Sequence, residues 1–436
     1  MSAPKPWLTA ALAAALLLPA SALAQTPPPG EEEEPPPPRV VVAAMDSAFN
    51  PYHEFFHHGG DGPYAEEPPS AVGPDVLEEF GIGPDQIIDV TRTGDFDADI
   101  AADGAQWARV ERGKPYWFEG TNVIGISFLQ SNWLRPQGKS AHGVGVSSAV
   151  LEANPEAVVV LVERGGGEAE AWAHTFPAVD ITTTSYGPIG SPPVPYHLGS
   201  SYTGVVRNGK LHFGAVDNTP ALSPIDSTGG PWWSIGVAGF QEGTTNGRQL
   251  QSGSLPDFVG NWTQSLPYCT NCESGRQTVS GTSFASPRSA GVMSAILLEA
   301  RRAAEHIGGI VTEDLERPLM VAGEEIRLTN WDLRRALEEA AAYIPAGVSN
   351  SPSHLPVPEQ APWTVTGWGA ITTDPAHRVI PEALAHLGVA GEPTRHKSSE
   401  ACSFMTAQIE ARYVYWNYYA FLGESWLEED DPYIRC

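Results

Sequence analysis

Short apolar runs rich in β-branched residues recur from residue 39 onward. In chain order they are RVVVAAMD, QIIDV, TNVIGISFL, EAVVVLVE, AVDITTTSYG, KLHFGAVDN and WWSIGVAGF. Several are apolar throughout and do not alternate, which is typical of parallel strands covered on both faces. Helical or Gly/Pro-rich pieces separate the runs, so each one predicts a separate strand.

Segments with a helical pattern lie between and after these runs. We expect helices over HGVGVSSAVLEAN, YTGVVRNG and the long SFASPRSAGVMSAILLEARRAAEHIG, and an amphipathic helix over residues 330–343. Residues 366–388 predict a closing strand and helix. This alternation predicts an α/β domain with a mostly parallel sheet and crossover helices.

The two ends of the chain differ from this central region, residues 40–388. Residues 1–24 carry one lysine, an Ala/Leu run and a final Ala-Leu-Ala, the order of a secretory signal peptide cleaved after Ala24. Residues 25–39, rich in Pro and Glu, predict an extended, solvated spacer. Residues 389–436 lack the alternation and predict a C-terminal extension with Cys and aromatic residues. We therefore expect a secreted protein, extracellular or periplasmic.

The net charge of the chain excludes some classes of binding partner. The chain has 52 Asp and Glu against 25 Lys and Arg, a net charge of −27, so a nucleic acid or an anionic membrane would meet long-range repulsion. After the signal segment, no run approaches the roughly 20 apolar residues that a spanning helix needs. We expect a soluble mature protein that binds neither nucleic acid nor membrane.

Three reactive side chains lie where an expected strand ends or an expected helix begins. Asp46 closes the first apolar strand, at the edge where open α/β sheets place their sites. His142 and Ser283 each lie at the start of a helix, where the dipole stabilises developing negative charge. Each residue alone is explained by turn chemistry, packing or capping. Together they have one of the known chain orders of a catalytic triad, Asp then His then Ser.

Three motifs carry a resemblance to a known family. SGTSFASPRSAGVMSAIL resembles the serine segment of the subtilisin-like serine proteases (subtilases, peptidase family S8), whose pattern is GTS-x-[AS]-[AS]-P followed by a helix. VVVAAMDS resembles the aspartate strand of the family, and AHGVGVSSAV resembles its histidine helix. The resemblance spans about residues 40–388 and implies a three-layer fold with a mostly parallel seven-stranded sheet.

The resemblance also implies an activity, that of a secreted serine endopeptidase acting on polypeptides. Asp46, His142 and Ser283 take the triad roles, with an acyl-enzyme on the serine. Asn218, at the end of LHFGAVDN, takes the role of oxyanion donor together with the Ser283 backbone N–H. No cofactor is required for this chemistry. Relatives often bind structural calcium, and the acidic composition is compatible with such a site.

Two segments correspond to the walls of a substrate cleft in the family. An extended peptide is expected to add as a strand along Ser185, Tyr186 and Gly187. The opposing wall of the first specificity pocket is expected from Gly214, Ala215 and Val216. A strand-ending turn explains the first three side chains equally well, and the chemistry of the pocket is not readable from the sequence.

Several positions depart from the family pattern. Ala48 stands where a glycine is usual, and Gly145 where a second histidine is usual. Asp217 replaces a glycine beside the oxyanion asparagine, where a carboxylate opposes the developing charge unless it points away. The aspartate and histidine motifs are also far apart, which predicts an insertion over about residues 51–120.

These departures keep other functions open. Asp217, and a leader too short for a folded pro-domain, favour as an alternative a low-turnover or inactive subtilisin-like scaffold that binds peptides. An esterase or a transpeptidase using the same acyl-enzyme is a third candidate. The acceptor of the acyl group, water or an amine, distinguishes these from a protease.

Cysteines, histidines and aromatic residues give the remaining expectations. Secretion permits disulfides, and among three connectivities we expect Cys269–Cys272 and Cys402–Cys436. Cys269–Cys272 as half of a zinc site lacks a second ligand pair nearby. The aromatic segment 413–421 is expected to dock the tail, and Trp232 and Trp233 to pack at a strand start. Potential metal ligands in the insertion are better explained by a mobile polar loop, so no metal ligand is assigned: they are His53, His57, His58 and Asp61.

Overall fold

The computed structural model describes most of the chain after residue 36. The described residues are 37–129, 134–136, 140–163, 166–186, 195–216, 218, 227–240, 256–304, 319–321, 324–326, 328–342 and 366–419. The expected signal peptide and nearly all of the expected spacer lie outside them.

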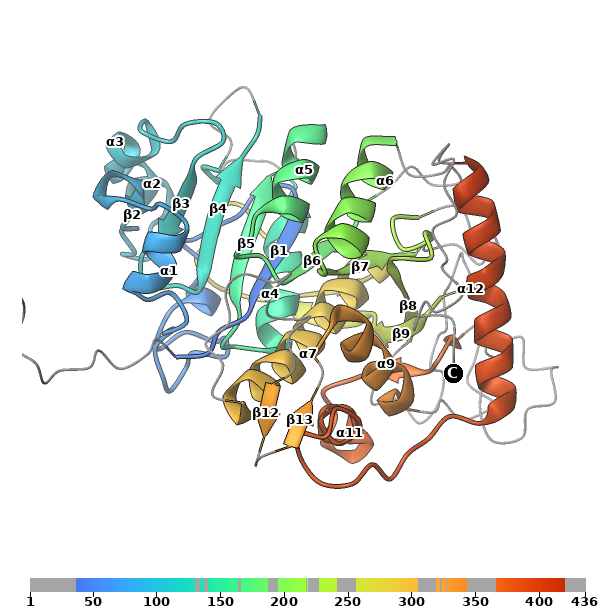
Figure 1. The fold of residues 1–436 in the computed structure, drawn as a ribbon. Helices are drawn as coiled ribbons and strands as arrows, with labels where there is room; N and C mark the ends of the chain where they lie inside the picture. Colours follow the sequence, from blue (N-terminus) through green and yellow to red (C-terminus); the bar gives the residue numbers. More distant parts are fainter. Residues whose placement is uncertain are drawn as a thin grey trace, which may run out of the picture. The chain divides into compact units, whose positions relative to one another are not determined.

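Seven parallel strands form the centre of the sheet. They are β1 (Val41–Asp46), β4 (Val123–Ser127), β5 (Val158–Glu163), β6 (Ile181–Thr184), β7 (Leu211–Ala215), β8 (Ile235–Phe240) and β9 (Phe258–Asn261). They lie in the order β9-β8-β7-β6-β1-β5-β4, and every neighbouring pair is parallel. Figure 1 shows them side by side from β4 to β9. The predicted parallel sheet is therefore confirmed.

Three further strands extend this sheet to ten among the described residues. They are β2 (Ile87–Ile88), β3 (Pro115–Phe118) and β14 (Ala370–Ile371). β3 pairs antiparallel with β4, and β2 pairs with β3, so segment 51–120 widens one edge. β14 adds parallel to β9 at the other edge. The expected count of seven, implied by the resemblance, equals the number of central parallel strands but is too low for the whole sheet. The apolar runs did not predict β9, nor β3, a four-residue edge strand beginning with proline and so a weak signal in sequence.

The helices and the remaining short elements complete the list. The α-helices are α1 (Pro74–Glu79), α2 (Phe96–Ala102), α3 (Gly104–Trp107), α4 (His142–Ala153), α5 (Gly167–Thr175), α6 (Pro195–Tyr202), α7 (Thr282–Ala303), α9 (Asn330–Ala340), α11 (Val379–His386) and α12 (Ser399–Tyr419). Shorter turns of helix are η1 (Glu54–Phe56), η2 (Pro84–Gln86), η3 (Thr203–Arg207) and η4 (Pro375–His377). Two hairpins, β10 (Thr263–Leu266) with β11 (Gln277–Ser280) and β12 (Leu319–Val321) with β13 (Glu324–Ile326), stand apart from the main sheet. No helix among the described residues is long and apolar enough to cross a membrane.

Alternate side chains of the central strand enter different cores. In β1, Val42 and Ala44 pack in the core that contains residues of α4 and α7, whereas Val41, Ala43 and Met45 pack in the core that contains residues of α1 and α5. This is the period-two alternation of a strand. Both sets are fully buried, so helices cover both faces and the architecture has three layers.

A buried ion pair connects α7 to the start of two strands. The guanidinium of Arg301, in the last turn of α7, donates to both carboxylate oxygens of Asp180 at 2.7 and 3.0 Å. Asp180 directly precedes β6, and its Oδ2 also accepts the N–H of Val41 at 2.8 Å. Arg301 further donates to the carbonyl of Arg39 at 2.6 Å. The far end of α7 is thereby fixed against the first residues of β1.

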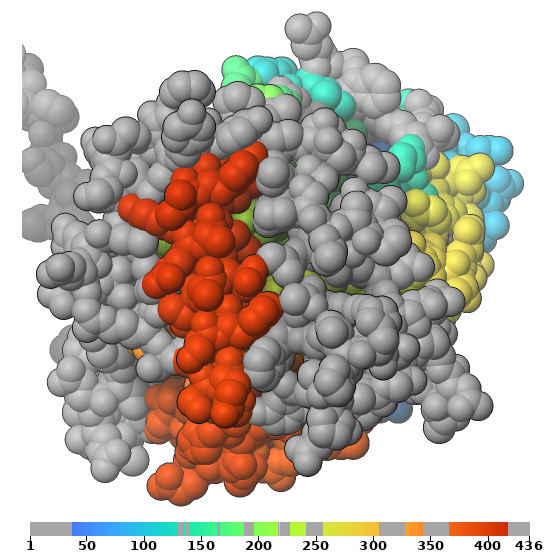
Figure 2. Space-filling view, turned by 90° about the vertical axis from the view of Figure 1, so that its right-hand side faces the viewer, coloured from blue at the N-terminus to red at the C-terminus, as the bar shows by residue number. Residues whose placement is uncertain are grey.

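Helix α12, in the expected C-terminal extension, packs on an aromatic cluster. Ile409 and Trp416 are buried in this cluster together with Trp233. The indole N–H of Trp416 donates to the carbonyl of Gly230 at 3.0 Å. Figure 2 shows α12 in red along the face turned to the viewer. The described part of the aromatic tail segment therefore docks on the core, as expected.

A second buried carboxylate connects α12 to the sheet. Asp257, just before β9, lies between the guanidinium groups of Arg334 in α9 and Arg412 in α12, at 3.1 and 3.0 Å. The same carboxylate accepts the N–H of Gly236 in β8 at 2.7 Å. One acidic side chain thus joins two strands and two helices.

Neighbouring arginines in α7 provide a matched test of the buried pair. Arg301→Met leaves the Asp180 carboxylate buried without its hydrogen-bonded guanidinium partner, so we expect the free energy of unfolding to fall by about 3–5 kcal/mol. Arg302→Met removes exposed ion pairs with Glu156 and Glu299, and we expect a loss below about 1 kcal/mol. Urea unfolding of both variants measures the difference. Equal losses would contradict the assigned role of Arg301.

Candidate active site

The structure brings Asp46 and His142 into direct contact. Asp46 is the last residue of β1 and His142 the first of α4. The ring Nδ1 of His142 lies 2.9 Å from each carboxylate oxygen of Asp46. The carboxylate is nearly inaccessible, while a quarter of the imidazole surface is exposed. Since an aspartate can only accept, Nδ1 carries the proton and Nε2 is left as the basic nitrogen.

Two glycines allow α4 to approach its neighbours. A Cβ on Gly143 would lie 2.5 Å from the carbonyl oxygen of Ser47, so only glycine lets the helix begin against the end of β1. The N–H of Gly143 donates to the Ser47 hydroxyl at 3.1 Å, which fixes this approach. A Cβ on Gly145 would lie 2.9 Å from the Phe284 ring and 3.0 Å from that of Tyr268. The departure at Gly145 therefore has a packing reason, because aromatic rings fill the space.

Ser283 lies in the first turn of α7, and the next residue reaches the histidine. The rings of Phe284 and His142 are 5.4 Å apart. The Ser283 hydroxyl is half-buried and lies 3.4 Å from the carbonyl oxygen of Ser185, a long and weak hydrogen bond. In return, the Ser185 hydroxyl donates to the Ser283 carbonyl at 2.8 Å. The ends of β1 and β6 and the starts of α4 and α7 thus meet at one place.

The orientation of Asn218 follows from its contacts. Its Oδ1 accepts the backbone N–H of Thr282 at 2.8 Å and the hydroxyl of the same residue at 2.9 Å. A backbone N–H can only donate, so the amide oxygen must face Thr282 and the NH₂ must face away from it. A Cβ on Gly281 would lie 3.5 Å from this Nδ2. Asn218 is therefore an exposed donor held beside the start of α7.

In the first turn of α7, one backbone N–H is without an acceptor among the described residues. Helix geometry gives the first amides no intrahelical acceptor. Thr282 N–H is taken by Asn218, and the N–H groups of Phe284 and Ala285 donate to the Gly281 carbonyl at 3.0 and 3.3 Å. The N–H of Ser283 donates to no acceptor among the described residues. This N–H and the Asn218 amide are thus two donors at the start of α7.

The expected cleft residues are only partly described. Ser185 is buried and Tyr186 half-buried at the end of β6, whereas Gly187 and Asp217 lie outside the described residues. Gly214 packs against other backbone, since a Cβ there would lie 2.3 Å from the N of Gly229.

The other two expected pocket residues follow Gly214 along the chain. Ala215 and Val216 are also buried, and the Val216 carbonyl accepts the hydroxyl of Thr282. Thr282 contacts both Asn218 and Val216. The sequence alone did not indicate this residue, although it is the middle residue of the Gly-Thr-Ser motif.

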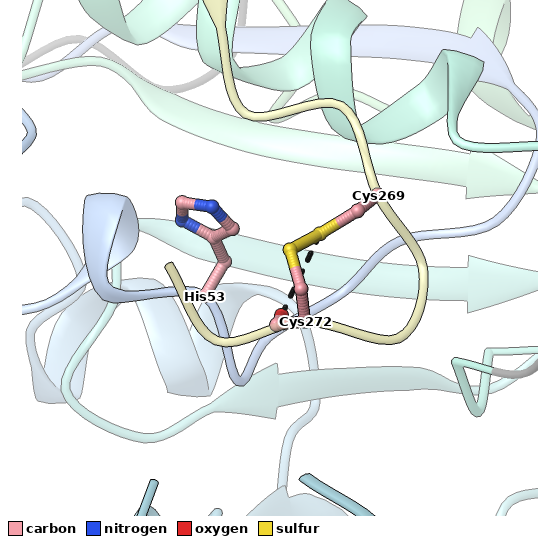
Figure 3. Close-up of side chains that lie close together, drawn as sticks. All are labelled: His53, Cys269 and Cys272. Atoms are coloured by element: carbon pink, nitrogen blue, oxygen red, sulfur yellow. Dashed lines mark hydrogen bonds between the residues drawn. A yellow bond between two sulfur atoms is a disulfide. The ribbon is translucent and has the colours of Figure 1, made fainter. Parts of the chain in front are cut away.

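A disulfide lies in the loop between β10 and β11. Cys269 and Cys272 are bonded, as expected, with their Cα atoms 5.9 Å apart, and Figure 3 shows His53 beside them. The side-chain amide of Asn50 donates to the Cys272 carbonyl at 2.7 Å, which connects this loop to the segment after β1. Cys402 is also disulfide-bonded, and its expected partner Cys436 lies outside the described residues.

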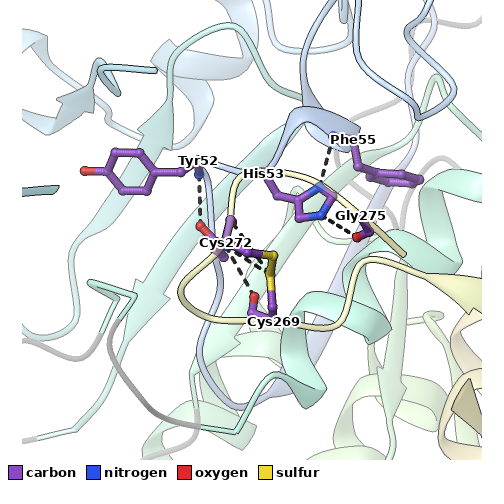
Figure 4. The surroundings of a disulfide bond; sticks show 7 residues. Tyr52, His53, Phe55, Cys269, Cys272 and Gly275 are labelled. Carbon is purple, nitrogen blue, oxygen red and sulfur yellow. Dashed lines mark hydrogen bonds between the residues drawn. A yellow bond between two sulfur atoms is a disulfide. The ribbon is translucent and has the colours of Figure 1, made fainter. Parts of the chain in front are cut away.

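The histidines of the insertion are packed, which corrects the expectation of a mobile polar loop. His53 and His57 are buried, and burial lowers the pKa of both, that of His57 to about 4. In Figure 4 the ring of His53 lies between the N–H of Phe55 and the carbonyl of Gly275, at 3.2 and 2.8 Å. His58 is exposed. The carbonyl of Gly275 that His53 contacts lies 222 residues away along the chain, which no local pattern reveals.

Comparisons with known proteins give similarity at the level of the fold. No family model and no curated protein matches the chain. Among solved structures, the prenylagaramide maturation protease PagA is similar (12% identity, 81% of this chain, 95% of that chain, TM-score 0.47). So are the patellamide maturation protease PatA (12%, 79%, 98%, 0.42) and a cold adapted subtilisin-like serine proteinase (15%, 74%, 88%, 0.38). The interpretation of the site rests on the contacts described above.

Proposed function

We propose that this chain is a serine endopeptidase that hydrolyses polypeptides through an acyl-enzyme on Ser283. The observation that carries the proposal is the contact of both Asp46 carboxylate oxygens with Nδ1 of His142, beside the first turn of α7. A buried acid, an imidazole oriented by that acid and a helix-terminal serine are the three groups that make an alcohol nucleophilic.

The proposed reaction has two halves. His142 takes the proton of the Ser283 hydroxyl as its oxygen attacks the scissile carbonyl carbon, and Asp46 stabilises the imidazolium that results. The imidazolium gives that proton to the departing amine, which breaks the C–N bond and leaves the acyl group on the serine. Water then attacks the ester with the same proton transfers, and the acid product and free enzyme are released.

The charge that develops on the carbonyl oxygen needs donors already in place. The amide of Asn218 and the N–H of Ser283 are the candidates, because the first is oriented by Thr282 and the second has no acceptor among the described residues. Both lie at the positive end of α7. Such preorganised donors stabilise the transition state without reorganisation during the reaction.

Substrate is proposed to lie as an extended strand along Ser185, Tyr186 and Gly187, held by main-chain hydrogen bonds. The proposed substrates are polypeptides. The proposed reaction uses no cofactor, and a structural calcium site stays a prediction. Export through the predicted signal segment is part of the proposal.

The serine substitution tests the chemistry directly. We expect the intact chain to react with a fluorophosphonate and to cleave a peptide library, and Ser283→Ala to abolish both, because no alcohol remains to be acylated. Ser286→Ala, three residues on in the same helix, is the matched control with unchanged labelling. Mass spectrometry of adducts and products is the measurement. Peptide binding without labelling or cleavage by the intact chain would identify a scaffold instead.

The acceptor of the acyl group separates the remaining alternatives. In the library experiment with an added amine, hydrolysed products support the endopeptidase. Amine-capped products would identify a transpeptidase, and hydrolysis of esters alone would identify an esterase.

Asn218→Ala tests the oxyanion donor. Loss of one preorganised donor is expected to lower kcat by about 10²–10³ with little change in KM, because the interaction strengthens only in the transition state. Asn208→Ala, a half-buried asparagine bonded to the His174 carbonyl away from the site, is the control. A kcat within about twofold of the parent value would remove Asn218 from the mechanism.

The leader has its own test. If residues 1–24 direct export, the protein recovered outside the cytoplasm should begin at Gln25, as read by N-terminal sequencing. Recovery inside the cell with the leader intact would contradict secretion and would leave the catalytic proposal unaffected.

A further inference from the structure

A second group of reactive side chains is fully buried between α5 and α6. Glu170 and His174 lie one turn apart on α5, and His197 projects from α6. Their exposed fractions are 2%, 0% and 0%. One donor atom from each lies within 4.8 Å of the others. None of the three belongs to the proposed catalytic site.

Hydrogen bonds leave this group incompletely satisfied. Oε2 of Glu170 is 3.1 Å from Nδ1 of His197 but 3.8 Å from Nε2 of His174, which is too far for a hydrogen bond. Nε2 of His174 has no hydrogen-bond partner among the described residues. Buried polar atoms left unpaired are costly, so the arrangement calls for a further group at the centre of the cluster.

The spacing fits a tetrahedral metal ion. Bonds of about 2.1 Å to Zn²⁺ place neighbouring donor atoms about 3.4 Å apart in a tetrahedron. The observed separations from Glu170 Oε2, 3.1 and 3.8 Å, lie on either side of this value. Two histidines and one carboxylate are a common ligand set for Zn²⁺, and imidazole favours transition metals over calcium or magnesium.

The residues around His174 and Glu170 bury and orient these proposed ligands. The ring of His174 is fully buried. Its Nδ1 lies 3.4 Å from the hydroxyl of Thr182, which turns Nε2 toward the cluster. The Glu170 carboxylate is buried as well, with 2% of the residue exposed. A divalent ion would neutralise this carboxylate.

Neighbouring histidines and the other clusters are weaker candidates. His212 lies 5.1 Å from His174 ring to ring, but both its nitrogens already lie beside threonine hydroxyls. The cluster of His53 with Cys269 and Cys272 has its sulfur atoms joined in a disulfide. In the cluster with Glu339 and His396, Nε2 of His386 already donates to the carbonyl of Arg395.

We propose that Glu170, His174 and His197 bind one divalent transition-metal ion, with Zn²⁺ as the first choice and water as the fourth ligand. The ion would cross-link α5 to α6. The ring of His197 lies 6.3 Å from that of Tyr186, so the cross-link also supports the end of β6, next to Ser185. The proposal does not depend on the proposed protease activity.

Metal content of the full-length chain tests the site. The Ser283→Ala protein, purified without a histidine tag, is stripped with EDTA, incubated with ZnCl₂ and desalted. We expect elemental mass spectrometry to give about one zinc per chain. The Tm of the reconstituted protein should be about 5 °C higher than that of the stripped protein. The double variant His174→Gln, His197→Gln should retain no zinc and show no zinc-dependent shift.

Two further variants keep the result interpretable. Glu170→Gln preserves size, so it should fold, as judged by circular dichroism, and lose at least about tenfold in zinc affinity by calorimetry. His212→Gln, equally buried but outside the ligand set, should retain one zinc per chain even if its Tm falls. Absence of zinc from the parent protein after reconstitution, or equal zinc in the parent and the Glu170→Gln variant, would overturn the proposal. Neither readout uses catalysis, so failure here is distinct from failure of the protease proposal.

Discussion

The ion pair between Arg301 and Asp180 fixes the helix on which the candidate active site depends. Helix α7 carries Ser283 in its first turn and Arg301 in its last, about 27 Å apart at 1.5 Å per residue. Asp180 also accepts the N–H of Val41, the first residue of β1, and β1 ends at Asp46. One buried carboxylate therefore holds the far ends of both elements, and the register of α7 against β1 decides where the serine lies relative to the acid.

At the other end of β1 and α7, the elements are held by close approach of their backbones and not by an ion pair. Gly143 lets α4 begin against Ser47, and the aromatic rings that exclude a side chain at Gly145 include Phe284, next to the serine. The first turn of α7 is completed by Asn218. The contacts that orient the reactive groups are thus the same contacts that pack α4 and α7 on the sheet. Contacts of this kind hold reactive groups in position, which is what preorganised electrostatic stabilisation requires.

The buried Glu170 cluster follows a different principle. The buried carboxylates of Asp180 and Asp257 each pair directly with a buried guanidinium group. Glu170 instead faces two imidazoles, one of them beyond hydrogen-bond distance. This difference supports a metal site at the Glu170 cluster, because a carboxylate so deeply buried is normally paired or bound to a metal.

The sequence by itself determined most strands of the main sheet and the chemistry of the motifs. Continuous apolar runs such as residues 158–163 can only be satisfied inside a covered sheet, and GTS followed by an apolar helix places a serine in the first turn of that helix. Tertiary structure alone decided the edge strand β3, the burial of His57 and the meeting of Glu170 with His197. The meeting of Glu170 with His197 joins side chains from two different helices, and a local pattern records the polarity of a residue but not the groups that fold against it.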